Sequence, residues 1–252
     1  ARYYRDTCSL PDWETRAEAR LREEAKEKNN MVALQELLGI SFRGQKHCIV
    51  GAGTGGLAVT LRQDYAVDVY GVEPESSALD IIQEKIRSVG IPADHFTAEA
   101  GEHMSWPDNS FDVVHCYTVL EHVADPDQCL KEMTRIVKPG GIVYVHTPNY
   151  AFPYEGHYKV FFPTFLPRFV GSVYLRLLGK SPKFLETINL FTERDINRLL
   201  VHHPGIVWMR VYRPVKPSKG RIGWLMNWLI FRRFVYMHQE IILKKIAPSR
   251  SA

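Results

Sequence analysis

The sequence has little cysteine, no long hydrophobic run and only a small charge imbalance. Its four cysteines include no CxxC pair, which excludes a disulfide-rich secreted scaffold and favours reduced thiols in a cytoplasmic protein. We expect neither a signal peptide nor a membrane span, because no stretch approaches the roughly 20 apolar residues that a span needs. The net charge of +4 is too small to indicate nucleic-acid binding by itself.

At 252 residues and 45% hydrophobic residues, the chain can form one large domain, or one domain with an added lobe. A charged helix is predicted from Trp13 to Leu38, with Asp12 as a candidate cap. Short β-rich segments then alternate with helices, which indicates a parallel sheet covered on both faces. The predicted strands are 47–50, 67–73, 111–117 and 141–148, and the predicted helices between them are 55–63, 76–88 and 126–137.

The character of the chain changes after Asn149. Residues 150–185 are rich in Pro, Phe, Tyr and Leu without a clear period, and Thr192 is the predicted N-cap of a later helix at 192–200. Two further strands are predicted at 205–212 and 240–246. We therefore divide the chain into an N-terminal helical lid segment (1–44), a core (45–149), and a substrate lobe with the final strands (150–252), which contains a basic, aromatic insertion at 214–236.

A glycine-rich segment, IVGAGTGGLAV at 49–59, follows the first predicted strand directly. Gly51, Gly53 and Gly56 satisfy the GxGxxG pattern of dinucleotide-binding turns, in which a ligand approaches the backbone and the helix N-terminus. Glu73 ends the second strand about 20 residues later, where a carboxylate binds ribose hydroxyls. These features predict a nucleotide-containing ligand and leave NAD and S-adenosylmethionine (SAM) both open.

The segment DNSFDVVHCYTVLEHVADPDQCLKEMTRIVKPGGIVYVHTPN at 108–149 separates the two ligands. Its FDVV strand, LEHV helix start and KPGG turn resemble, in this order, the middle of class I SAM-dependent methyltransferases. The resemblance covers about residues 45–150. It implies a methyltransferase with a Rossmann-like α/β fold, a doubly wound, seven-stranded, mostly parallel sheet. It also implies SAM as the methyl donor, S-adenosylhomocysteine as the product, and no metal.

The resemblance also implies a set of cofactor-binding residues. The glycine loop would surround the methionine part of SAM, and Glu73 would accept both ribose hydroxyls. Backbone amides near Gly101 and Glu102 would bind the edge of the adenine, and the last two residues of the segment 111–117 would lie beside the sulfonium. The full set is Gly51, Ala52, Gly53, Gly55, Glu73, Pro74, Gly101, Glu102, Cys116 and Tyr117.

Two positions depart from the family pattern. Ile49 stands where many members have an acidic residue that meets the SAM ammonium group, and Ala100 stands where many have an aspartate that binds adenine. Glu99 and Glu102 are both candidates to replace that aspartate.

Methyl transfer needs a general base only when the nucleophile carries a proton, as a hydroxyl or ammonium does. Substrate-facing groups of such sheets come from loops at the carboxyl ends of the strands. The segment YEGHYK at 154–159 lies there, and His157 is the preferred base candidate because imidazole titrates near neutral pH. Tyr158 and His122 complete the set of catalytic candidates, with a packing or pocket-forming role as the alternative for each histidine.

The C-terminal part from Arg210 onward contains ten Lys or Arg residues and a single acid, Glu240. Within it, Trp224 and Trp228 lie near helical spacing, followed by Arg232 and Arg233. Residues 221–236 are therefore a candidate amphipathic helix for an anionic membrane surface or an anionic substrate, with packing on the domain as the alternative. Nucleic acid is disfavoured as a partner because no recognised binding module accompanies the charge.

Three functional hypotheses follow. The first is a SAM-dependent methyltransferase that modifies an O or N atom of a small molecule, including a lipid-linked or sugar-linked one. The second is a SAM-binding regulatory or scaffold protein without catalysis, which only Ile49 and Ala100 favour. The third is an NAD-dependent oxidoreductase, which the segment at 108–149 disfavours.

Overall fold

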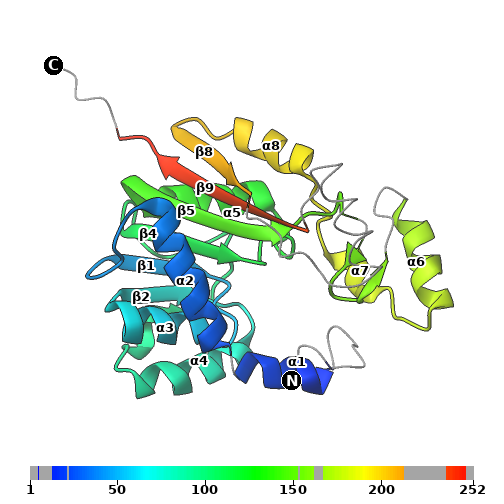
Figure 1. Ribbon diagram of the computed structural model, residues 1–252, viewed down its shortest axis with the longest axis horizontal. Helices are drawn as coiled ribbons and strands as arrows, with labels where there is room; N and C mark the ends of the chain where they lie inside the picture. Colours follow the sequence, from blue (N-terminus) through cyan, green and yellow to red (C-terminus); the bar gives the residue numbers. More distant parts are fainter. Residues whose placement is uncertain are drawn as a thin grey trace.

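Seven strands form the central sheet in the order β3-β2-β1-β4-β5-β9-β8 (Figure 1). The computed structural model describes residues 5, 13–21, 23–152, 154–161, 167–212 and 237–247. The strands of the sheet are β1 (Lys46–Val50), β2 (Asp68–Val72), β3 (Phe96–Thr97), β4 (Phe111–Tyr117), β5 (Val137–Pro148), β8 (Ile206–Val211) and β9 (His238–Lys245). The helices between them are α1 (Trp13–Leu21), α2 (Glu24–Leu38), α3 (Gly56–Tyr65), α4 (Ser76–Ser88), α5 (Pro126–Ile136) and α8 (Glu193–Val201).

The pairing of the strands confirms the predicted doubly wound, mostly parallel sheet. The pairs β1–β2, β1–β4, β2–β3 and β4–β5 are all parallel. β9 lies between β5 and β8 and is antiparallel to both. Because β1 is central and the chain winds outward from it on both sides, the carboxyl ends of β1, β2, β4 and β5 meet at one edge, where such sheets bind ligands.

Two hydrophobic clusters cover the two faces of the sheet. Helices α2, α3 and α4 bring Met31, Leu61 and Ile82 to one face. Helices α5 and α8 bring Met133 and Leu200 to the other. The cysteines at 48, 116 and 129 are free thiols and all are buried, as expected for reduced cysteines in a core.

The N-terminal segment differs from the single helix predicted over Trp13–Leu38. It forms two helices, α1 and α2, and Glu23 lies between them. The carboxylate of Glu23 does not cap α2 and accepts a hydrogen bond from the backbone N–H of Gly56 at the start of α3 (3.0 Å). The helix is therefore interrupted at Glu23, whose side chain contacts α3 instead. The charge pattern of the sequence does not predict this tertiary contact.

The segment after β5 forms a separate lobe that contains a short hairpin and two helices. These elements are β6 (Tyr154–Glu155), β7 (Val160–Phe161), α6 (Arg168–Leu177) and α7 (Lys183–Thr187). In Figure 1, α6 and α7 lie together on the right, away from the central sheet. The lobe has a hydrophobic cluster of its own, whose buried members are Tyr150, Tyr158, Leu175, Phe184, Leu185 and Ile188.

The predicted amphipathic helix at 221–236 lies outside the described residues, as does the whole insertion at 214–236. Among the residues that the structure describes, no helix is both long enough and apolar enough to cross a membrane.

Thr192 is the N-cap of α8, as the sequence predicts, and forms a reciprocal capping box with Asp195. Thr192→Ala removes the hydroxyl that accepts from the Asp195 N–H, so we expect it to lower the free energy of unfolding by about 1 kcal/mol. Urea unfolding measures this change. Thr192→Ser keeps the hydroxyl and should stay near the parent value, and an equal loss in both variants would contradict the capping role.

Candidate active site

The glycine loop between β1 and α3 passes very close to the segment that follows β4. Gly51 has a φ of 65°, and a Cβ atom built on it would lie 2.3 Å from Cγ2 of Val119. No other residue fits there without displacing Val119, because both the left-handed backbone and the close approach require glycine. The loop is thus held at the carboxyl edge of the sheet with its backbone accessible to a ligand.

Glu73 joins the end of β2 to this loop. Its Oε2 accepts a hydrogen bond from the backbone N–H of Gly53 (2.7 Å), and its Oε1 accepts one from the N–H of Glu75 (3.0 Å). The side chain is almost completely buried, while the neighbouring Pro74 and Glu75 are exposed. A carboxylate has about four acceptor positions, so ribose hydroxyls are suitable donors to this side chain.

A second carboxylate, that of Glu23, reaches the loop from the N-terminal segment. Its Oε1 accepts from the Gly56 N–H and from the Thr54 hydroxyl (2.5 Å). A Cβ on Gly56 would lie 2.2 Å from Cγ of Glu23, so a larger residue here would displace the Glu23 side chain. A negative charge at the N-terminus of α3 is favourable for the helix dipole, and it ties the predicted lid segment to the cofactor loop.

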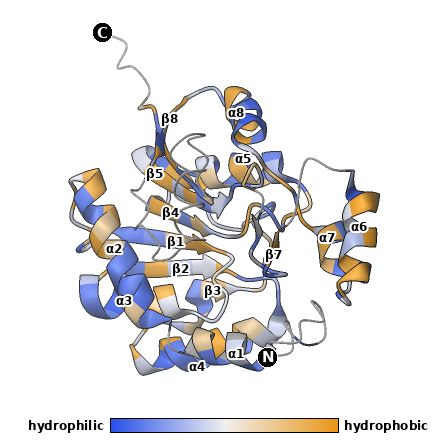
Figure 2. Ribbon diagram, turned by 45° about the vertical axis from the view of Figure 1, so that its right-hand side comes forward, coloured by the Kyte–Doolittle hydropathy of each residue, from blue (hydrophilic) through white to orange (hydrophobic). Residues whose placement is uncertain are grey.

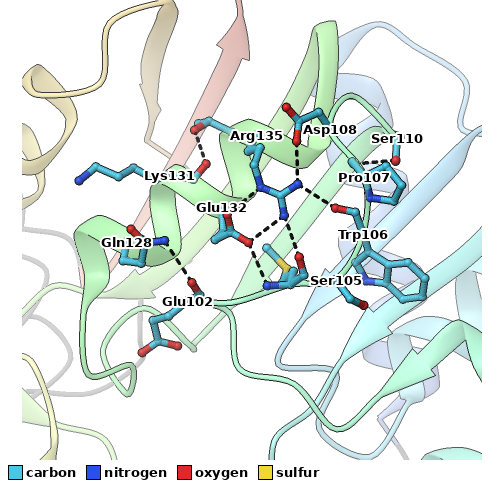
Figure 3. Close-up of polar contacts among 12 residues, drawn as sticks. Glu102, Ser105, Trp106, Pro107, Asp108, Ser110, Gln128, Lys131, Glu132 and Arg135 are labelled. Carbon is cyan, nitrogen blue, oxygen red and sulfur yellow. Dashed lines mark hydrogen bonds and ion pairs between the residues drawn. The ribbon is translucent and has the colours of Figure 1, made fainter.

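The loop after β3 carries the predicted adenine-facing residues Gly101 and Glu102. Figure 3 shows how α5 holds it through Arg135. The Arg135 guanidinium donates to the backbone oxygens of Met104 and Trp106, each at 2.8 Å, and pairs with Glu132 and Asp108. The hydrogen bond from Arg135 lowers the pKa of Glu132, which keeps that partner charged.

Glu99 and Glu102 are the two candidates to replace the missing adenine-binding aspartate, and the carboxylate of each is bonded to a backbone N–H group of the protein. Oε2 of Glu99 accepts from the Ser105 N–H at 2.8 Å, and Oε1 of Glu102 accepts from the Ala124 N–H at 2.8 Å. Gly101 is buried beside Val50 at the end of β1. The carboxylates of Glu99 and Glu102 therefore stabilise the loop, and its backbone remains the predicted contact to adenine.

Cys116 and Tyr117, at the end of β4, face opposite sides of the sheet. Cys116 is fully buried in the core beneath α5, so only its backbone is present at the ligand-binding edge. The Tyr117 ring packs on the other face, near His115 and His146. The next residue, Thr118, has a φ of 52°, a strained conformation for a β-branched side chain and one that is common at functional sites.

His157 forms a carboxylate–imidazole pair with Glu155 in the β6–β7 hairpin. Nδ1 of His157 lies 2.6 Å from Oε1 of Glu155, and Oε2 of Glu155 accepts from the Tyr158 N–H, also at 2.6 Å. Glu155 is 1% exposed, whereas the His157 side chain is 25% exposed. When Nδ1 donates to the carboxylate, Nε2 of the neutral ring carries the lone pair, which is the arrangement of a general base.

Glu121 and His122, from the LEHV segment, lie beside this pair. The His122 ring is 5.5 Å from the His157 ring, centroid to centroid. Burial lowers the pKa of His122 to about 4 and raises that of Glu121 to about 7, where the Thr147 hydroxyl donates to Oε2 (3.0 Å). Although Nε2 of His122 is 3.9 Å from Oε1 of Glu121, the two are not an ion pair, because the imidazole is neutral wherever the carboxylate is charged.

The three catalytic candidates therefore meet in one place, where β4, β5 and the hairpin come together. Tyr158 is 3% exposed, and its hydroxyl accepts from the Leu185 N–H (3.1 Å), so its main contact is with the core of the lobe. Sequence reasoning missed the role of Glu155 as the partner of His157. In the sequence, the Glu-Gly-His order indicates this pairing, because a single glycine separates the two potential partners.

A hollow of about 330 Å³ lies elsewhere, between the ends of α5, α8 and β9. Its basic side chains already have partners: Lys131 and His203 contact Asp127, and the Lys245 ammonium donates to three backbone oxygens and to Asn109. It therefore offers no ready anion site. Among the described residues, no group of His, Cys, Asp and Glu has the arrangement of a metal site.

The sheet order is that of the Rossmann-like fold shared by class I methyltransferases. Residues 49–145 match the sequence family described as a methyltransferase domain. This segment therefore carries a methyltransferase domain of the class that uses SAM as its methyl donor.

Individual relatives are similar over part of the chain. A ubiquinone/menaquinone biosynthesis C-methyltransferase of Haemophilus ducreyi is 26% identical over 68% of this chain and 67% of its own length. A ubiquinone biosynthesis O-methyltransferase of Klebsiella pneumoniae is 34% identical, but over only 42% of this chain and 43% of its own length. In structure, phosphoethanolamine N-methyltransferase 2 of Haemonchus contortus, solved with S-adenosylhomocysteine, has a TM-score of 0.56 at 16% identity. That match covers 88% of this chain and 53% of the nematode protein, and shows the fold alone.

The raised pKa of Glu121 predicts a pH-dependent stability. The folded protein binds this proton more tightly than the unfolded chain, so stability should fall as the pH rises from about 4.5 to above 7, by roughly 3 kcal/mol. Glu121→Gln keeps the acceptor for Thr147 and cannot ionise. From pH 5 to pH 8 its stability relative to the parent should therefore improve, measured by urea unfolding at each pH.

The matched control is Glu84→Gln, which changes an exposed carboxylate on α4. Its stability difference from the parent should be the same at pH 5 and pH 8. If the stability difference between Glu121→Gln and the parent is also the same at pH 5 and pH 8, the prediction is wrong, and Glu121 ionises in the folded protein as an ordinary carboxyl group does.

Proposed function

We propose that the protein methylates a hydroxyl oxygen of a small, lipid-linked acceptor, with His157 as the general base. The observation that carries this proposal is the contact between Glu155 and His157 at the carboxyl edge of the sheet, 2.6 Å between Oε1 and Nδ1. A hydroxyl must lose its proton during methyl transfer, whereas a carbon nucleophile activated by a neighbouring oxyanion needs no base at this position.

SAM supplies a methyl group that its positive sulfur has already activated. In the proposed transfer, the acceptor oxygen forms a bond to the methyl carbon as the carbon–sulfur bond breaks, and the hydroxyl proton passes to Nε2 of His157. Glu155 fixes the orientation of the imidazole and balances the positive charge that it gains. The glycine loop and Glu73 hold the donor in line, which supplies much of the rate.

The surroundings of His157 support an acceptor with apolar parts. Phe184 lies 4.5 Å from the His157 ring, centroid to centroid, and the neutral His122 ring lies 5.6 Å from Phe184. The two biosynthetic relatives are named for ubiquinone, a lipid-like product. One of them is named a C-methyltransferase, so transfer to carbon is the second candidate reaction.

Glu73→Ala should weaken SAM binding at least about tenfold, because it removes charge-assisted hydrogen bonds to the ribose hydroxyls. Calorimetric titration with SAM measures the change, and circular dichroism checks that the variant is folded. Asp80→Asn, an exposed substitution on α4, is the control and should bind as the parent does. Unchanged SAM affinity in folded Glu73→Ala would remove Glu73 from the cofactor site.

His157→Ala should lower kcat by roughly 10²- to 10⁴-fold with SAM affinity unchanged, the usual contribution of a general base. Added imidazole should restore part of the activity, which a purely structural loss would not allow. The measurement is turnover of a hydroxylated acceptor by mass spectrometry.

Two controls accompany this variant. His202→Gln alters an exposed histidine outside the site and should keep the parent rate. Glu155→Gln keeps an acceptor for the Tyr158 N–H but removes the charge, so its kcat should fall less than that of His157→Ala while KM stays constant. Full activity of His157→Ala would place the base elsewhere.

A further inference from the structure

Helix α6 presents an apolar stripe to solvent on the outer side of the lobe. Phe169, Val173 and Leu177 follow each other at intervals of four residues and are 70%, 50% and 82% exposed. Side chains four residues apart lie on the same side of a helix, so the three form one continuous stripe. Leu178, directly after the helix, and Phe161 at the end of β7 are also exposed.

The stripe is not the packing face of α6. Gly171 and Leu175 are the buried residues of the helix, and Leu175 belongs to the cluster that α6 shares with α7. Arg168 fastens the start of the helix to the lobe by donating to the backbone oxygens of Leu185 and Ile188, at 2.8 and 2.7 Å. The helix is thus held firmly on one side and leaves its second apolar side uncovered among the described residues. Figure 2 shows α6 at the right of the molecule with hydrophobic residues along it.

The charge around the stripe is mainly positive. Residues 156–187 contain one acid, Glu186, which is exposed on α7, and five basic side chains: Lys159, Arg168, Arg176, Lys180 and Lys183. Arg176 is exposed and lies three residues from Val173, at the border of the stripe. An apolar stripe bordered mostly by cations is complementary to a surface that is hydrophobic inside and anionic outside, which describes an anionic lipid bilayer.

We propose that α6 and the adjoining end of β7 dock the protein on an anionic lipid bilayer. A ten-residue helix is about 15 Å long, so it lies in the interface with its apolar side among the lipid head groups and does not cross. Docking at this place sets the lobe that carries His157 against the membrane, where an acceptor with a lipid tail would be held. The proposal concerns residues different from the helix expected at 221–236 and does not depend on the acceptor.

The test is co-sedimentation of the full chain with phosphatidylcholine vesicles, with and without phosphatidylglycerol, at low and high salt. Binding should require phosphatidylglycerol and weaken as salt screens the attraction. The double variant Phe169→Gln/Leu177→Gln should lose roughly tenfold or more in vesicle affinity, with SAM binding unchanged because neither residue touches the cofactor site. Arg176→Gln/Lys180→Gln should lose binding chiefly at low salt.

Val201→Gln is the matched control, because Val201 is an equally exposed apolar residue (73%) on α8, outside the lobe. It should bind vesicles as the parent does. Vesicle binding by Phe169→Gln/Leu177→Gln equal to that of the parent would overturn the proposal, as would equal binding to neutral and anionic vesicles. A dimer that forms through the stripe would also overturn it, and light scattering would detect that as a halved mass in the double variant.

Discussion

The hydrogen bonds of the Glu73 carboxylate are the constraint on which the site depends. By accepting from the N–H groups of Gly53 and Glu75, this side chain joins the glycine loop to the end of β2. Removal of the carboxylate would free the loop and also remove the predicted ribose contact. The parallel order of β2, β1 and β4 places this junction beside the segment that carries Glu121 and His122, so the fold alone brings donor and acceptor regions together.

Buried carboxylates form a second level of organisation around the proposed acceptor site. Glu155 is buried and holds both His157 and the hairpin backbone, and Glu121 is buried with a raised pKa. Burying an acidic group is unfavourable unless it has a partner. Both oxygens of Glu155 have one, in His157 and the Tyr158 N–H, and these bonds fix the geometry of the hairpin. Glu121 has the Thr147 hydroxyl on Oε2 but, in the described part of the chain, no hydrogen-bond partner on Oε1, which agrees with its raised pKa.

Much of this arrangement could be predicted from the sequence where local pattern and topology agree. The alternation of strands and helices predicts the parallel core, and the position of Thr192 before an amphipathic segment predicts the helix cap that its hydrogen bonds confirm. The contacts of Glu23 with Gly56 and of Arg135 with the loop after β3 could not be predicted, because they join residues 33 and about 30 positions apart without any periodic signal. The sequence predicts a substrate lobe after residue 150 but not its helices α6 and α7, since their apolar residues face both inward and outward and show no single period.

Transfer of an isotopically labelled methyl group from SAM to a short-chain prenylated catechol would test the central claim most directly. Fragmentation of the product by mass spectrometry locates the label on oxygen or on the ring. If His157 removes the proton of the acceptor hydroxyl, the label should appear in a methoxy group. The parent should form this product, and His157→Ala should form much less of it. Label on a ring carbon, or equal methoxy formation by both proteins, would contradict the account.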